Sequence, residues 1–571
     1  MRPWHLGNTT VRSPFRLREG LVALSTSALQ GNLRGRSQEI ALRQLLGEHG
    51  IVSLGDDETY SVGRKWRSAL GKLGFLYPEI PAASGIQQET IGPLDTITPN
   101  GWRLIRAESV PAMQECFLRA LAAHYIPSVL EERYDFSVFS PLRHTLSVML
   151  ALEARTGAGK LNFVEMGLVV QLTSSDDDMG EIVDRVLDLR ARRQAAPNKR
   201  QFDREERDAA AALHDYAATT FNDYADTNFR YLKATGLVHG AGRGVALVPE
   251  KRVFIEQLIR DAAAPESSTD YFLSLCNGAA LPTDNYDAAQ VVLNDLIQQV
   301  RARGIEFDLT GRPKDTPADI EQIRHYLEEL LFEANEEAYA ASQAALWEEI
   351  ATYMEIIATR GGGSRTLATG EEITVPRDEA PAYFEWILWR AFLAINSLAN
   401  RPSEARRFRV DQDFLPVGTA PGNGPDLIFE FADFVVVVEV TLTTNSRQEA
   451  AEGEPVRRHV ANLVTHYAET MGKPVYGLFI ANRIDSNTAE TFRIGIWYTN
   501  EDERKRLDII PVTLADFRTF FEAMFRAGRV DIGHIRELLD LCSELRPHHE
   551  APAWKQGIAE TIRGRVALLL Q

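Results

Sequence analysis

The spacing of apolar positions changes near residue 380 and separates a helical N-terminal part from a mixed C-terminal part. Between residues 139 and 200, and again between 285 and 360, apolar residues recur with a helical period. Beyond residue 380, short apolar runs of strand length alternate with helical stretches. The pattern predicts a multidomain α+β protein with helical N-terminal units and a C-terminal α/β domain.

Two N-terminal segments have the order of a winged helix, in which a helix is followed by a strand, a turn and a strand. The first has a predicted helix at 61–71, a strand opening at 74–77 and a returning strand at 96–105, with a turn at Asn100-Gly101. The second has a helix at 224–234 and a hairpin at 236–248. Both segments therefore favour winged-helix-like DNA-recognition units.

A helical linker is predicted between these units and the C-terminal domain, because one apolar stripe runs through Ile320, Ile323, Leu327, Leu330 and Leu331. The predicted domains are 1–135 (an arm plus a winged helix), 136–284 (a second winged-helix-like unit), 285–375 (an acidic helical linker) and 376–571 (the α/β domain).

The C-terminal domain is predicted to contain three helices and four strand regions. The expected strands are 408–410, a hairpin of 426–431 with 434–441, 475–480 and 509–512, and the expected helices are 384–398, 455–467 and one that follows the strand 509–512.

Length and composition limit the number of domains and the cellular location that we expect for the protein. At 571 residues the chain is too long for one core, since domains usually hold roughly 100–200 residues. No apolar run reaches the roughly 18–20 residues that a bilayer-spanning helix needs, and the N-terminal residues do not have the pattern of a signal peptide. Three scattered cysteines form neither a disulfide framework nor a zinc motif. We expect a cytoplasmic protein without a membrane partner.

The net charge of −18 argues against nucleic acid, but its distribution weakens that objection. Residues 319–355 contain ten acidic residues and one Arg, whereas residues 1–45 contain seven Arg and two Glu. DNA responds to local potential and not to whole-chain charge. Basic residues in the arm and the predicted winged helices are the candidate DNA contacts, although such clusters are also common on a solvated face: Arg12, Arg16, Arg18, Arg64, Lys65, Arg67, Arg230 and Lys233.

Two acidic residues on neighbouring predicted strands carry the candidate chemistry. Asp426 starts the first strand of the hairpin, and Glu439 lies near the end of the second, with Val437 and Thr441 on its face. Two buried carboxylates would repel each other unless a divalent cation such as Mg²⁺ lay between them. Taken singly, each residue would more often be structural, Asp426 as a turn residue at the end of a strand and Glu439 as a charge on an edge strand.

The order of helix and strands around these acids is that of the PD-(D/E)XK nuclease core, although Thr441 stands where that motif has Lys. Motifs along the chain are more specific: Phe384-Glu385-Trp386, Leu415-Pro-Val, Ala420-Pro-Gly-Asn-Gly-Pro-Asp426, Glu439-Val-Thr441 and Glu454-Pro-Val-Arg-Arg-His459. In this order the chain resembles the AlwI family of type IIS restriction endonucleases, which includes related strand-specific nicking enzymes.

This resemblance implies a set of site residues. The family's catalytic acids fall on Glu385, Asp426, Glu439 and Glu452, with Glu454 as the alternative to Glu452, and its histidine falls on His459. Arg458 is the candidate cation in place of the missing Lys. Asp426, Glu439 and Val440 are the candidate ligands of Mg²⁺.

The resemblance also implies an activity. A type IIS enzyme hydrolyses double-stranded DNA at a fixed offset from a short asymmetric site and leaves a 5′-phosphate and a 3′-hydroxyl. Cutting both strands needs a transient homodimer or a second subunit. The alternatives are a strand-specific nicking endonuclease, a non-catalytic DNA-binding protein, and a nuclease that recognises DNA structure instead of sequence.

Overall fold

The computed structural model describes residues 2–9, 11, 13–52, 60–261, 264–368, 372–499 and 501–571. The chain forms two compact units, Met1–Phe332 and Glu333–Gln571, and the division falls within helix α15 (Pro317–Ser342). In the parts of the chain that the structure describes, no helix is long and apolar enough to cross a membrane. The four predicted domain boundaries remain predictions.

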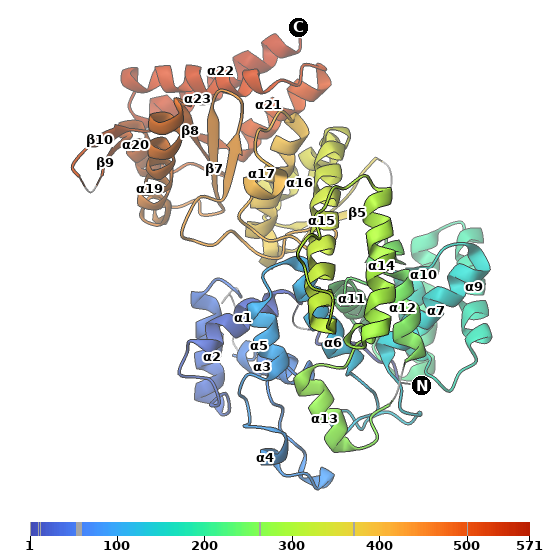
Figure 1. The fold of residues 1–571 in the computed structure, drawn as a ribbon. Coiled ribbons are helices and arrows are strands. Elements are labelled where there is room, and N and C mark those ends of the chain that lie inside the picture. Colours follow the sequence, from blue (N-terminus) through green and yellow to red (C-terminus); the bar gives the residue numbers. More distant parts are fainter. Residues whose placement is uncertain are drawn as a thin grey trace. The chain divides into compact units, whose positions relative to one another are not determined.

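The first unit is mainly helical (Figure 1). Before the N-terminal part of α15, its helices are α1 (Arg16–Ser25), α2 (Arg36–Glu48), α3 (Val62–Lys72), α4 (Gln88–Ile91), α5 (Pro99–Arg106), α6 (Val110–Ala122), α7 (Pro141–Thr156), α8 (Phe163–Leu168), α9 (Met179–Ala195), α10 (Lys199–His214), α11 (Ala218–Ala234), α12 (Arg252–Arg260), α13 (Ser268–Asn277) and α14 (Tyr286–Ala302). Its one three-stranded sheet among the described residues has the order β1 (Lys160–Asn162), β3 (Gly244–Leu247) and β2 (Val238–Gly240).

The returning strand predicted at 96–105 is wrong, because most of this segment is helix α5. Thr98 caps the helix by accepting a hydrogen bond from the backbone N–H of Gly101, and Pro99 occupies the first turn. Both features start helices, and they override the turn signal of Asn100-Gly101. A single antiparallel bridge between Leu76 and Ile97 is the only pairing of the two expected strands.

The second predicted helix and hairpin are confirmed. Helix α11 contains residues 224–234, and β2 pairs antiparallel with β3 across the turn at 240–244. The structure adds strand β1, which pairs antiparallel with β3 and lies directly before α8. The winged-helix character of either unit remains a prediction.

The apolar stripe of the predicted linker is confirmed as a packing face. Ile320, Ile323, Leu327 and Leu331 are buried against Leu293, Leu296 and Val300 of α14, and Leu330 packs at the edge of this core. The N-terminal part of α15 is therefore an integral part of the first unit.

The second unit contains a four-stranded sheet, two small hairpins and further helices. After the C-terminal part of α15, its elements are α16 (Trp347–Arg360), β4 (Gly363–Thr366), β5 (Glu372–Val375), α17 (Ala380–Ile395), α18 (Pro402–Ala405), β6 (Leu427–Glu430), β7 (Val435–Thr441), α19 (Glu454–Leu463), β8 (Val475–Ala481), α20 (Ser486–Ile494), β9 (Ile496–Tyr498), β10 (Arg504–Arg506), β11 (Asp508–Thr513), α21 (Leu514–Arg526), α22 (Ile532–Leu545) and α23 (Ala551–Leu569).

The sheet has the order β11-β8-β7-β6, with β6 antiparallel to β7 and the other two pairings parallel. Figure 1 shows β7 and β8 between α17 on one side and α19 and α20 on the other. Burial on both faces explains why β7 and β8 are almost continuously apolar. The strand expected at 408–410 is wrong, since Val410 makes only an isolated bridge to Pro416.

Candidate active site

The register of the β6–β7 hairpin brings Asp426 and Glu439 together. Leu427 pairs with Val438, so the next position outward sets Asp426 opposite Glu439, on the same face of the sheet. The carboxylate of Asp426 accepts a hydrogen bond of 2.9 Å from the backbone N–H of Val440. The side chain of Glu439 is buried with 7% exposure. The two acids predicted from the sequence therefore form one pair, in which Glu439 is buried and Asp426 is half-buried.

Burial and mutual repulsion disfavour the charged forms of this pair. Burial, followed by the charge of Glu439, raises the pKa of Asp426 well above its ordinary value, against the opposing effect of the Val440 N–H. Burial and the charge of Glu452 raise the pKa of Glu439 to about 8. Such an arrangement favours a bound cation or shared protons.

Helix α17 contributes a third acid from the face of the sheet. Glu385 is 5% exposed, and its carboxylate accepts a hydrogen bond of 2.7 Å from the backbone N–H of Ala420. Burial and the charge of Asp426 raise the pKa of Glu385 well above its ordinary value. Glu385 therefore belongs to the same electrostatic group as Asp426 and Glu439.

Helix α19 supplies the predicted histidine. Nδ1 of His459 lies 2.7 Å from Oε1 of Glu439, and the side chain is buried. Nε2 is also buried, and no described residue offers it a hydrogen bond. Burial and the neighbouring Arg458 lower the pKa of His459, which favours a neutral imidazole. One ring nitrogen is thus held by Glu439, and the other is left for a ligand.

The two alternative acids before α19 have different surroundings. Glu452 lies in the π-helical turn Glu449–Gly453, hydrogen-bonds Thr441 through its side chain and raises the pKa of Glu439. Glu454 is exposed and holds Arg458 at 3.0 Å. The geometry therefore joins Glu452 to the acidic group, whereas Glu454 engages Arg458, the cation proposed to replace Lys.

A second cation was missed in the sequence. Arg407 donates to the carbonyls of Pro421 and Pro425 at 3.2 Å and to Oδ1 of Asn423 at 2.7 Å. Its charge opposes the upward pKa shifts of Glu385 and Glu439. Arg407 therefore holds the loop that leads into Asp426 and also acts on the acids electrostatically.

Sequence reasoning had one signal for Arg407. A side chain at Gly424 would meet this guanidinium, so the glycine of the Ala420–Asp426 motif leaves room for the end of the arginine side chain.

The predicted DNA contacts in the first unit fall into two groups. Arg64 and Lys65 are exposed on α3. Four others are engaged within the unit: Arg67 with Glu39 at 3.3 Å, Arg230 with Asp226 at 2.6 Å, Arg16 with the carbonyl of Gly50 at 2.8 Å and Arg18 with that of Ile105 at 2.9 Å. Lys233 is half-buried and also has a partner. Arg12 lies outside the described residues.

Within the described parts of the chain, one group of three acidic and histidine side chains has ligand atoms that all lie within 4.8 Å of one another: Glu115, Glu321 and His325 of the first unit. Both carboxylate oxygens of Glu115 are already bonded, one to Arg119 at 2.9 Å and the other to Arg324 and His325. A metal ion there would lie against two guanidinium groups, so this group fits a metal poorly.

The chain was compared with known proteins. A crystal structure of the small subunit of a heterodimeric restriction endonuclease aligns with 23% identity over 38% of this chain and 98% of that chain, with a TM-score of 0.29. No curated protein matches the chain. The sequence profile described as AlwI restriction endonuclease matches residues 71–520, most of the chain, including every candidate catalytic residue. The chain therefore belongs to the AlwI restriction endonuclease family, whose members are nucleases that act on DNA.

Proposed function

We propose that the chain is a type IIS restriction endonuclease that recognises DNA through its first unit and hydrolyses phosphodiester bonds at the Asp426–Glu439 pair of its second unit. The observation that carries the proposal is the register of β6 and β7, which sets these two carboxylates opposite each other on one face. Retention of both acids, with Glu385 and Glu452 beside them, argues against a non-catalytic DNA-binding protein.

The sheet supports assignment of the second unit to the PD-(D/E)XK class. An antiparallel hairpin that carries the acids is followed by a helix and a parallel strand, while α17 packs against β6 and β7. This arrangement agrees with the helix and strand order expected for that class. Thr441, which replaces the Lys of the motif, hydrogen-bonds Glu452.

The donor set fits a divalent cation of the kind that restriction endonucleases generally use. Asp426, Glu439 and the backbone carbonyl of Val440 would hold Mg²⁺, because hard oxygen ligands suit this ion and its charge would relieve the repulsion that raises the carboxylate pKa values. When bound, the ion supplies Lewis-acid polarisation of the phosphodiester.

The other residues of the site have separate roles in the reaction. Glu385 and Glu452 complete the negative field around the ion. Glu439 accepts a hydrogen bond from Nδ1 of His459 and so orients the ring, which leaves Nε2 of the neutral imidazole able to accept a hydrogen bond from the attacking water. Arg407 and Arg458 offset the charge that develops on the phosphate. The products are a 5′-phosphate and a 3′-hydroxyl.

One such site cuts one strand. Cleavage of double-stranded DNA therefore requires a transient homodimer or a second subunit, whereas the chain alone would act as a strand-specific nicking endonuclease.

Supercoiled plasmid incubated with Mg²⁺ or with EDTA tests the activity. We expect discrete linear or nicked products with Mg²⁺ only, and none from D426N. Run-off sequencing of those products gives the recognition site, the offset and the strand. Smeared products would favour a structure-specific nuclease, and an intact plasmid would reject the proposal.

A further inference from the structure

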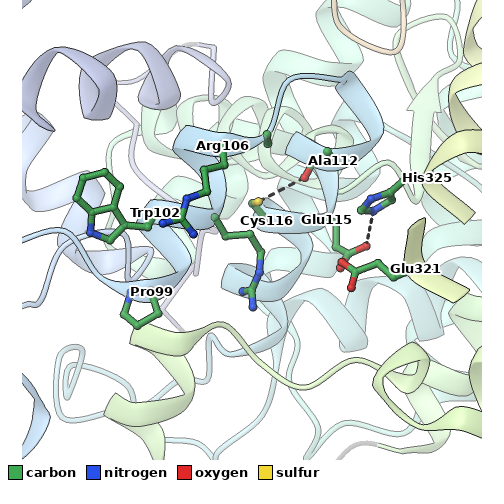
Figure 2. A pocket seen from close by; sticks show the side chains of 10 residues that line it. Pro99, Trp102, Arg106, Ala112, Glu115, Cys116, Glu321 and His325 are labelled. Carbon is green, nitrogen blue, oxygen red and sulfur yellow. Dashed lines mark hydrogen bonds and ion pairs between the residues drawn. The ribbon is translucent and has the colours of Figure 1, made fainter. Parts of the chain in front are cut away.

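A pocket of about 670 Å³ opens in the first unit, and its lining residues do not include those assigned to DNA contact in the sequence. Its lining comes from α5, α6 and the N-terminal part of α15. Figure 2 shows Trp102 and Arg106 on α5, with Glu115, Glu321 and His325 grouped apart from them. The volume falls in the range of roughly 300–1,000 Å³ that is usual for sites binding small molecules or parts of larger ligands.

Two side chains on α5 present unused hydrogen-bond donors to this pocket. Trp102 and Arg106 are four residues apart, so they lie one helical turn apart on the same face. Arg106 is exposed and Trp102 half-buried, and neither donates to any described residue. By contrast, Arg103 is anchored to Oδ1 of Asn100 at 3.2 Å and to the carbonyl of Asn277 at 3.1 Å.

Glu115, Glu321 and His325 form a polar wall of the pocket, whose groups can recognise the edge of a base. Glu115 is neutralised by Arg119 and Arg324 and holds Nε2 of His325 at 2.9 Å. Glu321 hydrogen-bonds Glu115, and burial followed by the charge of Glu115 raises the pKa of Glu321. The half-buried side chains of Glu321 and His325 thus present hydrogen-bonding atoms without a strong negative charge.

An aromatic face, a free guanidinium and a polar wall are together the chemistry of a nucleotide site. Aromatic side chains stack on bases, and arginines bind phosphates. A nucleobase can reach such a pocket from duplex DNA only by leaving the base stack.

We propose that this pocket receives one unstacked nucleotide of the bound DNA, with Trp102 against the face of the base, Arg106 on its phosphate, and Glu321 and His325 at the edge of the base. The inference rests on the proposed function, because it requires that the first unit bind DNA. The contact would let the enzyme test how easily one position of its site is unpaired.

Equilibrium binding to two labelled duplexes of the same sequence tests the proposal, one fully paired and one with a single bulged nucleotide. EDTA prevents cleavage, and the salt concentration is held fixed because affinity for DNA depends on it. The wild-type protein should prefer the bulged duplex about tenfold, since the cost of unpairing is already met. W102A and R106A should reduce this preference to near unity without weakening binding to the paired duplex.

Two matched variants separate the pocket from general effects. W102F keeps an aromatic face, and R204A removes an exposed arginine of α10 that does not line the pocket. Both should keep the preference for the bulged duplex. R106A alters an exposed side chain, so it remains informative should W102A fail to fold.

The inference is overturned if the wild-type protein shows no preference, or if W102A and R106A retain it, while plasmid cleavage is intact. It is also overturned if the four deoxynucleoside monophosphates compete with DNA for the pocket while the protein shows no preference for the bulged duplex. Loss of binding to both duplexes together with absence of plasmid cleavage would instead remove the proposed function.

Discussion

Nδ1 of His459 lies 2.7 Å from Oε1 of Glu439, across the gap between helix α19 and strand β7. This contact fixes the ring and leaves Nε2 buried without a partner among the described residues. A buried polar atom of this kind usually has a ligand or a functional role. The pair therefore connects the acidic group to whatever binds beside it.

Substitutions at His459 should distinguish the two ring nitrogens. H459N keeps a polar atom near the position of Nδ1, whereas H459Q keeps one near Nε2. If Nε2 accepts a hydrogen bond from the attacking water, H459N should lose cleavage as far as H459A, about 100-fold or more, and H459Q should retain more activity. Initial rates of plasmid cleavage at saturating Mg²⁺ measure this, and DNA affinity in EDTA should not change. Equal activity of H459N and the wild type would contradict a role for Nε2.

Neutral variants of the two neighbouring acids should separate their roles. E452Q removes a charge that acts on Glu439 and alters the partner of Thr441, so we expect a rate loss of about 10–100-fold, the usual effect of disturbing the surroundings of a metal site. E454Q is the matched control, because Glu454 is exposed and contacts Arg458. Its rate should stay within about threefold of the wild-type rate, since exposed ion pairs contribute little. The reverse order of the two losses would assign the site to Glu454.

The sheet and the acid pair were predictable because local patterns specify them. The apolar run Val435–Val438, the turn at Ala432-Asp433 and the strand period fix the register of the hairpin, and with it the position of Asp426 opposite Glu439. Helix α17 was predictable from length and continuous apolarity.

Features that depend on contacts between distant residues were not predictable. The loop bonds of Arg407 join segments that are separated in sequence, and no periodicity records them. The acidic residues of 319–355 resemble a solvated face, yet Glu336 is buried against Arg406 and Glu349 binds Arg390. Helix α5 was missed because its cap residues were outweighed by an Asn-Gly turn signal.

Arg407 and Arg458 are rival candidates for the cation that replaces the motif lysine. Arg407 holds the loop before Asp426 and lowers the pKa of both Glu385 and Glu439 against the other effects, while Arg458 is tied to Glu454. We expect R407A to reduce the cleavage rate by about 10–100-fold and R458A to reduce it less. G424A should resemble R407A, because its methyl group would displace the guanidinium. A larger loss in R458A than in R407A would reverse the assignment.

The raised pKa of Glu439 has a consequence for the stability of the metal-free protein. The pKa of folded Glu439 is about 8, so it keeps its proton up to about that pH, whereas an unfolded glutamate loses its proton near its ordinary pKa of 4.5. Between these values the folded state binds more protons, so the free energy of unfolding should fall as pH rises. Glu385 and Asp426, whose pKa values are also raised, act in the same direction.

Thermal unfolding in EDTA tests this consequence. The side chain of E439Q stays neutral at every pH. Its free energy of unfolding, relative to that of the wild type, should therefore increase by at least ~1 kcal/mol between about pH 5 and about pH 9, which corresponds to roughly 2–4 °C in melting temperature. E454Q should show no such growth. Mg²⁺ should restore the stability of the wild-type protein at high pH, because the ion binds the ionised carboxylates. A pH-independent difference between E439Q and the wild type would contradict the raised pKa.

The basic side chains of the first unit should separate into DNA contacts and structural ion pairs. Arg64 and Lys65 are exposed on α3, so R64A and K65A should each weaken DNA binding and reduce the salt slope by about one, with little change in stability. Arg67 contacts Glu39 and Asp95, and Arg230 contacts Asp226 and the carbonyl of Val11. R67A and R230A should therefore lower stability by about 1 kcal/mol and leave the salt slope unchanged. Binding measured over a series of salt concentrations, together with urea unfolding, gives both quantities for each variant. If R67A changed the salt slope while R64A did not, the half-buried Arg67 and not the exposed Arg64 would be the DNA contact of α3, although the two side chains are neighbours on the helix surface.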